Sequence, residues 1–267
     1  MKLNEFYQVA DGFAPKALSD EYCKRYGAYD NSGILVATGD EITSVLFSLD
    51  LSLNAIEKAK QIGANLIVTH HPAVYGKIGE INAEKDLLGE KLIKCIKNGI
   101  SVISMHLNLD CAEGGIDDSL AQGIGLATGK ENTCEYEVMH PLSIGGYGKV
   151  QTLAPIKVGE LAKKIGKEFS TSRVCVYGEE KTANRVASFC GAGADNEAVA
   201  FAVACGAQVI VSADFKHHVI TDALEAGLAV IALTHYASEH YGFQKYYEKI
   251  SRVVTLPCVL HTDTQLL

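Results

Sequence analysis

In the stretch Asn65-Leu66-Ile67-Val68-Thr69-His70-His71-Pro72, a short β-branched run ends in two adjacent histidines. An amphipathic segment precedes it, with apolar residues at helical spacing between Leu53 and Ile62 and a terminating Gly63. A helix followed by a short buried strand is the unit from which parallel sheets are built. The same alternation recurs along the chain and predicts an α/β protein with mainly parallel or mixed sheets.

The predicted elements follow one another with short connections. Strands are expected at 34–37, 45–49, 65–69, 100–104, 144–153, 174–177, 185–189, 209–211, 229–233 and 256–260, and helices at 53–62, 84–97, 117–123, 158–169, 195–204, 217–226 and 239–250. The stretch 127–134 is polar and poor in helix formers, so we place a domain boundary there. We expect a first domain from residues 1–126 and 240–267, and a second from 127–239.

Composition limits the classes of protein that fit. The 267 residues suit one large α/β domain or two small interlocked ones, and 48% hydrophobic residues are enough for a folded core. The net charge is −8 and no run of lysine or arginine occurs, which argues against general nucleic-acid binding. An acidic chain can still bind a nucleotide at a metal site, because the ions supply positive charge.

Cysteine usage and the apolar runs indicate the compartment. None of the eight cysteines forms a Cys-x-x-Cys pair, and residues such as Cys175 and Cys190 lie in apolar runs. We interpret them as small buried hydrophobes in a reducing compartment. The stretch from Met1 to Asp11 is polar without the apolar core of a signal peptide, and no apolar stretch approaches membrane-spanning length. We therefore expect a cytoplasmic protein with no membrane partner.

Metal-binding side chains follow three of the predicted strands. His70 and His71 follow the first, His106 and Asp110 follow the strand 100–104, and His235 follows the strand 229–233. Ligands in open α/β sheets bind at the carboxyl ends of strands, so these residues predict one metal site. Glu239 lies one helical turn after His235, so both side chains can face one ion. We predict His70, His71, Asp110, His235 and Glu239 as metal ligands.

Other histidines leave alternatives open. His106 is interpreted as a further ligand, an acid or base beside the metals, or a residue that orients a ligand. The pair His217-His218 resembles a ligand pair, but it begins a predicted helix, and we favour a solvent-facing role for it. His140 and His261 are interpreted as ordinary surface or hydrogen-bonded residues. On their own, Asp110 and Glu239 would be carboxylates at helix starts, stabilised by the helix dipole.

Mixed imidazole and carboxylate ligands favour Zn, Fe, Mn, Co or Ni over Ca or Mg alone. Two divalent transition-metal ions held side by side would activate a water molecule and polarise a substrate oxygen. Hydrolysis is the reaction class that this chemistry favours.

A glycine-rich turn, Gly191-Ala192-Gly193-Ala194-Asp195, lies between a predicted strand and a predicted helix. It resembles the start of a phosphate-binding loop, so Gly191 and Gly193 are candidate substrate-binding residues. The third glycine of the dinucleotide fingerprint is absent, and a tight turn with Asp195 as the helix cap is the simpler interpretation. The chain contains no Gly-x-Ser-x-Gly elbow and no Walker loop.

Three motifs, Val68–Pro72, Met105–Asp110 and Thr234–Glu239, resemble the signatures of the NIF3-like family, whose members are also called GTP cyclohydrolase 1 type 2 homologs. Asp30–Gly33 and Ser212–His218 fit its pattern as well. The resemblance implies two intertwined α/β domains, a dinuclear metal site in the cleft between them, and a ring-shaped homohexamer. It places the ligands on the same five residues, with His106 as a neighbour or further ligand.

The sequence departs from the family pattern in two places. The segment 130–136 leaves no room for the middle insertion that many members carry, and 6–29 is not typical of one long leading helix. With the resemblance included, we predict a metal-dependent hydrolase of cyclohydrolase type acting on a nucleotide or related heterocycle. A phosphoesterase, or a non-enzymatic metal-binding or regulatory assembly protein, remains the alternative.

Overall fold

The computed structural model describes residues 1–129 and 135–267. Contacts group them into two compact units, each formed from separate stretches of the chain. The first unit comprises Met1–Ala112 and Phe243–Thr262, and the second comprises Glu113–Gly242 and Asp263–Leu267. The sequence predicted that the chain passes from one domain to the other at 126/127 and at 239/240. Residues 130–134, which belong to the predicted boundary stretch, lie outside the described residues.

The first unit is built on a five-stranded sheet with the order β1-β4-β3-β2-β11. Its strands are β1 (Gly33–Val36), β2 (Val45–Ser48), β3 (Leu66–Thr69), β4 (Ser101–Ser104) and β11 (Cys258–His261). β11, β2, β3 and β4 run parallel, and only β1 is antiparallel to its neighbour. β1 and β2 follow one another in the chain but do not form a hairpin, because β1 pairs with β4 and β2 pairs with β3 and β11.

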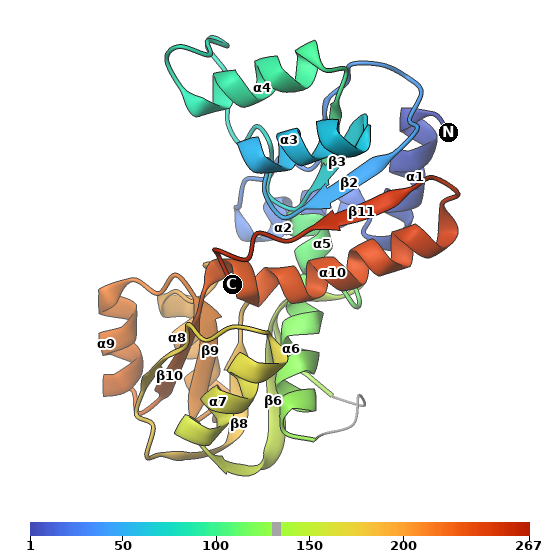
Figure 1. The fold of residues 1–267 in the computed structure, drawn as a ribbon. Helices are drawn as coiled ribbons and strands as arrows, with labels where there is room; N and C mark the ends of the chain where they lie inside the picture. Colours follow the sequence, from blue (N-terminus) through green and yellow to red (C-terminus); the bar gives the residue numbers. More distant parts are fainter. Residues whose placement is uncertain (130–134) are drawn as a thin grey trace. The chain divides into compact units, whose positions relative to one another are not determined.

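Helices cover both faces of this sheet (Figure 1). One face packs against α3 (Leu53–Ile62) and α4 (Leu87–Lys97) through an apolar cluster that includes Leu46, Ile56 and Ile67. On the opposite face, the fully buried Phe47 contacts Phe6 of α1 and the rings of Phe243, Tyr246 and Tyr247 of α10. The alternation of Leu46 and Phe47 follows from the two-residue period of a strand. The short helix α5 (Leu107–Cys111) follows β4 and was not predicted.

Two helices occupy the amino-terminal region. α1 (Leu3–Phe13) and α2 (Lys16–Tyr26) are separated by Ala14 and Pro15. The expectation that 6–29 is not one long helix is thus met, but the two shorter helices were missed. α1 buries Leu3, Phe6 and Ala10 on one face, a sparse helical pattern within an otherwise polar segment.

The second unit contains a six-stranded mixed sheet with the order β5-β6-β8-β9-β10-β7. Its strands are β5 (Glu137–Pro141), β6 (Gly146–Lys157), β7 (Cys175–Tyr177), β8 (Thr182–Ser188), β9 (Val209–Ala213) and β10 (Ala229–Leu233), and its helices are α6 (Ile116–Ala127), α7 (Val158–Glu168), α8 (Asn196–Ala204) and α9 (His217–Glu225). β8, β9 and β10 are parallel, whereas the other pairings are antiparallel. The mixed α/β fold predicted from the sequence is confirmed, and β5 is an addition to it.

The helix α10 (His235–Val253) begins four residues earlier than the sequence indicated. The boundary between the units falls within it, between Gly242 and Phe243. Its start at His235 matters for the site, because His235 and Glu239 then lie on the same helix.

Two further expectations can be compared with the structure. Cys190 is buried, but Cys175 is exposed on the short strand β7, so its interpretation as a buried hydrophobe was wrong. β7 is an edge strand of its sheet, so apolar neighbours in the sequence are not enough to bury Cys175. Across the described parts of the chain, none of the helices combines the length and apolar character that a membrane crossing requires.

Candidate metal centre

The first unit places its predicted ligands at the carboxyl edge of its parallel sheet. β3 and β4 are adjacent parallel strands in which Thr69 pairs with Ser104. His70 and His71 follow β3, and Met105 and His106 follow β4, so the register brings both pairs to the same edge. Asp110 then lies one turn into α5. The shared position that the sequence predicted from strand ends is thus observed within this unit.

These side chains form a close cluster. The His70 ring lies 4.9 Å from the His71 ring and 5.1 Å from the His106 ring, measured between centroids. His70 Nε2 is 3.5 Å from Asp110 Oδ1. Ligand atoms of His70, His106 and Asp110 all lie within 4.8 Å of one another. Both His70 and Asp110 are buried, with 0% and 4% of their surface exposed.

Each of the three histidines has its Nδ1 engaged by an acceptor. His70 Nδ1 lies 2.8 Å from the Met105 carbonyl oxygen. His71 Nδ1 lies 2.7 Å from Asp50 Oδ1, and His106 Nδ1 lies 2.7 Å from Asp30 Oδ1. An acceptor at Nδ1 fixes the proton there, so a metal would be bound through Nε2. This is the usual way in which proteins orient histidine ligands.

Asp30 pairs with the side chain of His106 in this cluster. Burial raises the pKa of Asp30, but hydrogen bonds from His106, Ser19 and Ser32 outweigh it and hold the pKa well below its ordinary value. Burial lowers the pKa of His106, but the hydrogen bond to Asp30 and the charge of Asp110 outweigh it and raise the pKa. The Ser32 hydroxyl also accepts from the His106 backbone N–H. His106 is therefore fixed in orientation through its backbone and through its side chain.

The donor set fits a transition-metal ion. Two ligand atoms at about 2.1 Å from a tetrahedral ion lie roughly 3.4 Å from each other. The 3.5 Å separation of His70 Nε2 and Asp110 Oδ1 agrees with that value. Imidazole nitrogens together with a carboxylate oxygen suit zinc, iron, manganese, cobalt or nickel. Within this unit, His70, His106 and Asp110 could hold an ion, and the ring of His71 lies beside them.

The second unit positions its two candidate ligands on one helix. His235 Nε2 lies 3.0 Å from Glu239 Oε1, one turn apart at the start of α10. His235 Nδ1 lies 2.6 Å from Asp214 Oδ2, so this histidine is oriented in the same way as the other three. Glu239 is 3% exposed, whereas about a third of the His235 side chain is exposed. Whether this pair shares ions with the cluster of the first unit stays a prediction.

Gly191 packs directly against this pair. Its φ is +55°, and a Cβ there would lie 2.3 Å from Glu239 Oε1 and 3.3 Å from His235 Cε1. Its N–H donates to Ser238 Oγ at 3.1 Å, and its carbonyl accepts from the Ala213 N–H. Glycine is required because no side chain fits between this backbone and the carboxylate. Gly191 is observed to approach the candidate ligands His235 and Glu239 closely, and contact with a substrate stays a prediction.

The rest of this turn packs against Tyr147 and is hydrogen-bonded to Asp117. A Cβ at Gly193 would lie 1.7 Å from the hydroxyl oxygen of Tyr147, and that hydroxyl donates to the Cys190 carbonyl oxygen at 2.6 Å. The buried Asp117 accepts from the Cys190 N–H at 3.1 Å, and its pKa is raised to about 6 because burial outweighs the charge of Lys149. Asp195 caps α8, as predicted, by accepting from the Ala198 N–H.

The remaining histidines lie apart from these groups. His217 and His218 begin α9 and are exposed, which agrees with the solvent-facing interpretation. His140 lies 3.3 Å from Glu197. Among the described residues, no candidate metal group includes His217, His218, His140 or His261.

The residues that orient the candidate ligands were not predicted from the sequence. The Asp50 carboxylate contacts His71 Nδ1, while Ser52 accepts from the Ala55 N–H and caps α3. Asp30 and Asp214 were noted only as parts of motifs. A carboxylate just after a strand end, as at Asp50 after β2 and Asp214 after β9, was the available signal.

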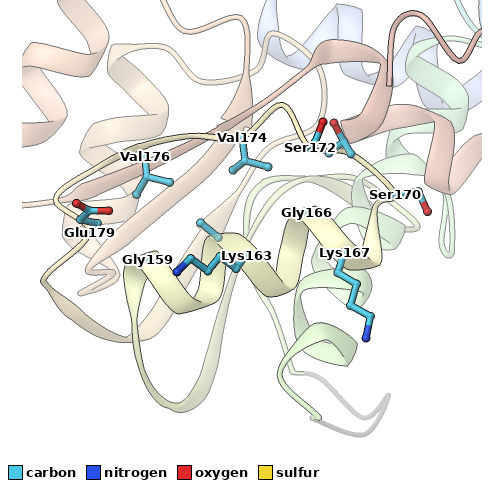
Figure 2. Close-up of a pocket in the computed structure, with 11 residues that line it drawn as sticks. Gly159, Lys163, Gly166, Lys167, Ser170, Ser172, Val174, Val176 and Glu179 are labelled. Carbon is cyan, nitrogen blue, oxygen red and sulfur yellow. The ribbon is translucent and has the colours of Figure 1, made fainter.

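A separate hollow of about 690 Å³ lies between α7 and β7 in the second unit (Figure 2). It is lined by Val174, Val176 and the glycines of α7, and by the charged residues Lys163, Lys167 and Glu179. None of the candidate ligands lines this hollow, so its size alone does not make it the functional site.

The sequence is similar to a known family and to named relatives. The family profile described as Duf34/NIF3 (NGG1p interacting factor 3) matches residues 1–263. Relatives named GTP cyclohydrolase 1 type 2 homolog occur in Clostridium perfringens and Methanocaldococcus jannaschii. The first is 30% identical over 94% of this chain and 91% of its own length, and the second is 30% identical over 97% and 98%.

Solved structures show the same fold. A hypothetical protein of Staphylococcus aureus aligns with a TM-score of 0.82 at 22% identity, covering 98% of this chain and 96% of its own. Reduced HcgD from Methanocaldococcus jannaschii aligns with a TM-score of 0.77 at 27% identity, covering 97% of each chain. Similarity of this extent covers both compact units.

Proposed function

The chain belongs to the Duf34/NIF3 family, and from that premise we propose that it is a metal-dependent hydrolase of cyclohydrolase type. Its substrate would be a nucleotide or a related heterocycle. The observation that carries this proposal is the cluster of His70, His106 and Asp110, in which both imidazoles are oriented through Nδ1. The names of the relatives supply the reaction type.

We propose five ligands for a pair of divalent transition-metal ions. His70, His71 and Asp110 come from the first unit, and His235 and Glu239 from the second. Bound ions of this kind lower the pKa of a water ligand and polarise a substrate oxygen. The geometry within each unit supports the individual ligand sets, because carboxylate and imidazole atoms lie 3.0–3.5 Å apart.

The side chains around the ligands have separate tasks. Asp50, Asp30 and Asp214 hold the rings of His71, His106 and His235 by their Nδ1 atoms. His106, held by Asp30 and about one-fifth exposed, is placed to accept or deliver a proton at its Nε2 if it does not bind an ion. Gly191 leaves room for the Glu239 carboxylate to remain beside His235.

Metal content tests the ligand assignment. We expect protein purified without chelators to contain transition metal, and His70→Ala combined with Glu239→Ala to remove it while leaving the circular dichroism spectrum unchanged. His140→Ala is the matched control, because it removes a histidine that belongs to no candidate metal group among the described residues. Metal retained by the double variant would contradict the assignment.

Single variants test whether the two sets share ions. If they do, His70→Ala and Glu239→Ala should each weaken binding of every ion. If each unit binds its own ion, each variant should lose one binding event and keep the other in a cobalt or zinc titration. The second result would overturn the shared pair while leaving metal binding intact.

Turnover tests the reaction. Protein reconstituted with Zn, Mn or Fe should open the ring of GTP or a related heterocycle, and the double variant should be inactive. Release of phosphate without ring opening would identify a phosphoesterase. Inactivity with all three metals on GTP and on a panel of phosphoesters would favour a non-enzymatic metal-binding role.

We also propose a homohexamer, on the basis of family resemblance. Light scattering should then give six times the 28.6 kDa mass of the chain. A monomeric mass at micromolar concentration would contradict this assembly.

A further inference from the structure

Two exposed tyrosines pack against each other at the edge of the first unit's cluster. Tyr29 and Tyr75 are 55% and 54% exposed, although large aromatic side chains are usually more buried. Their rings lie 5.4 Å apart between centroids, edge to face, and the Tyr75 hydroxyl donates to the Tyr29 carbonyl oxygen at 3.1 Å. The pair is therefore ordered by its own contacts while much of its ring surface faces solvent.

The two chain segments that carry these tyrosines also carry residues of the candidate metal cluster or their hydrogen-bond partners. Tyr29 immediately precedes Asp30, the partner of His106, and Tyr75 lies four residues after His71. The Asn31 side-chain amide donates to the Val74 carbonyl oxygen at 2.6 Å and joins the two segments. The Tyr75 ring lies 6.3 Å from the His106 ring, at 85° to it. A movement of either tyrosine would therefore disturb the surroundings of His106.

We infer that Tyr29 and Tyr75 form a stacking platform for a planar aromatic ring of the substrate, an inference that rests on the proposed function. A ring in contact with Tyr75 would lie about 3.5–4 Å from its face, which brings the substituents of that ring within reach of the cluster around His106. Aromatic platforms accept heterocycles without hydrogen-bond readout, because every such ring presents a π-face. The ligand class is a planar heterocycle.

The adjoining loop leaves room for the rest of such a molecule. Directly after Tyr75, Gly76–Glu80 line an open hollow of about 760 Å³, together with Asp86 and Leu88. Lys77, Glu80 and Asp86 place charges of both signs in this lining, so a polar substituent would remain hydrated there. A ring on the tyrosine pair and a polar tail over this loop would use neighbouring parts of the same unit.

Binding of guanosine, as a purine probe, and of ribose 5-phosphate, as a probe without an aromatic ring, tests the platform by calorimetry on metal-loaded protein. Tyr75→Leu removes the ring but keeps an apolar side chain, and should weaken guanosine binding roughly 5-fold to 100-fold while leaving any binding of ribose 5-phosphate unchanged. Tyr75→Phe keeps the ring and should bind guanosine within about threefold of the unaltered protein. Tyr177→Leu is the matched control, since Tyr177 is an exposed tyrosine of the second unit.

The outcomes separate this inference from the proposed function. Metal content is measured on every variant and should not change. Equal guanosine affinity for Tyr75→Leu and unaltered protein, or no guanosine binding by protein that holds metal, would overturn the platform and leave the metal site standing. If the unaltered protein took up no transition metal but still bound guanosine through Tyr75, the platform would be supported and the metal-dependent function would be overturned. A changed oligomeric mass in Tyr75→Leu, with unchanged guanosine binding, would identify the pair as a contact between copies and overturn the platform.

Discussion

The two compact units position their candidate ligands by different structural means. In the first, His70, His106 and Asp110 come from the ends of two adjacent parallel strands and from the short helix that follows. In the second, His235 and Glu239 lie one turn apart on a single helix. The comparison shows that sheet register fixes one ligand set, whereas helical periodicity and one glycine fix the other.

The candidate ligands of the two units also differ in how deeply they are buried. His70 is fully buried, and its neighbours on β3 and β4 constrain its backbone. About a third of the His235 side chain is exposed, and the position of Glu239 depends on the space left by Gly191. The second set should therefore be more sensitive to a change in a residue that is not itself a ligand.

The largest expected effect comes from Gly191→Ala. The added Cβ would lie 2.3 Å from Glu239 Oε1, so the carboxylate must move away from His235. We expect metal affinity to fall by about 100-fold, while the positive φ costs only about 1–2 kcal/mol of unfolding free energy. Metal titration and chemical denaturation measure the two effects separately.

Gly206→Ala is the matched control for that variant. Gly206 has a φ of +69°, and no atom lies within 4 Å of the position that a Cβ would take, so the substitution carries the backbone strain alone. It should destabilise the protein to a similar degree and leave metal affinity unchanged. Equal metal loss in both variants would show that strain, and not displacement of Glu239, is the cause.

The same contrast explains what could be predicted from the sequence. The strand-end histidines and the four-residue spacing of His235 and Glu239 are local patterns, so they were found. The pairing of Asp50 with His71 and of Asp30 with His106 depends on how distant segments meet, which no local spacing encodes. Gly191 was recognised as part of a turn, but its contact with Glu239 joins residues 48 positions apart and required the structure.

Asp214→Asn and Asp50→Asn sharpen the comparison, because they make the same change behind one histidine of each unit. Each removes the charge that holds an Nδ1 atom, at His235 and at His71. We expect each to lower metal affinity by roughly 10-fold to 100-fold, since the ring loses its fixed orientation and basicity. Zinc or cobalt titration measures this, and an unaffected Asp50→Asn would mean that His71 does not bind the ion.

Asp30→Asn tests the most buried of these carboxylates through stability in metal-free protein. The pKa of Asp30 is held below the ordinary 3.8, so its stabilising contribution is present above that pH and is lost as acid protonates it. The pKa of His106 is raised above 6.5, so its contribution is present below that pH and declines as the pH rises further. The variant should lose about 1–3 kcal/mol near pH 6 and less at either extreme.

Denaturant titrations at pH 3, 6 and 9 check this dependence. Asp40→Asn is the control, because the Asp40 side chain is exposed and its ion pair is with the exposed Lys2. A loss that is the same at all three pH values would contradict the paired arrangement of Asp30 and His106.

The smallest effect concerns the helix caps, where the two units should behave alike. Ser52 Oγ accepts from the Ala55 N–H at 3.0 Å in the first unit, and Asp195 Oδ1 accepts from the Ala198 N–H at 2.9 Å in the second. Ser52→Ala and Asp195→Ala should each cost about 1 kcal/mol, and replacement by glycine only a few tenths. Denaturant midpoints measure these changes, and metal affinity should remain that of the unaltered protein. If Asp195→Ala alone weakened metal binding, the turn from Gly191 to Asp195 would have to move as one body. The metal affinity of the second unit would then depend on that whole turn and not on the single glycine.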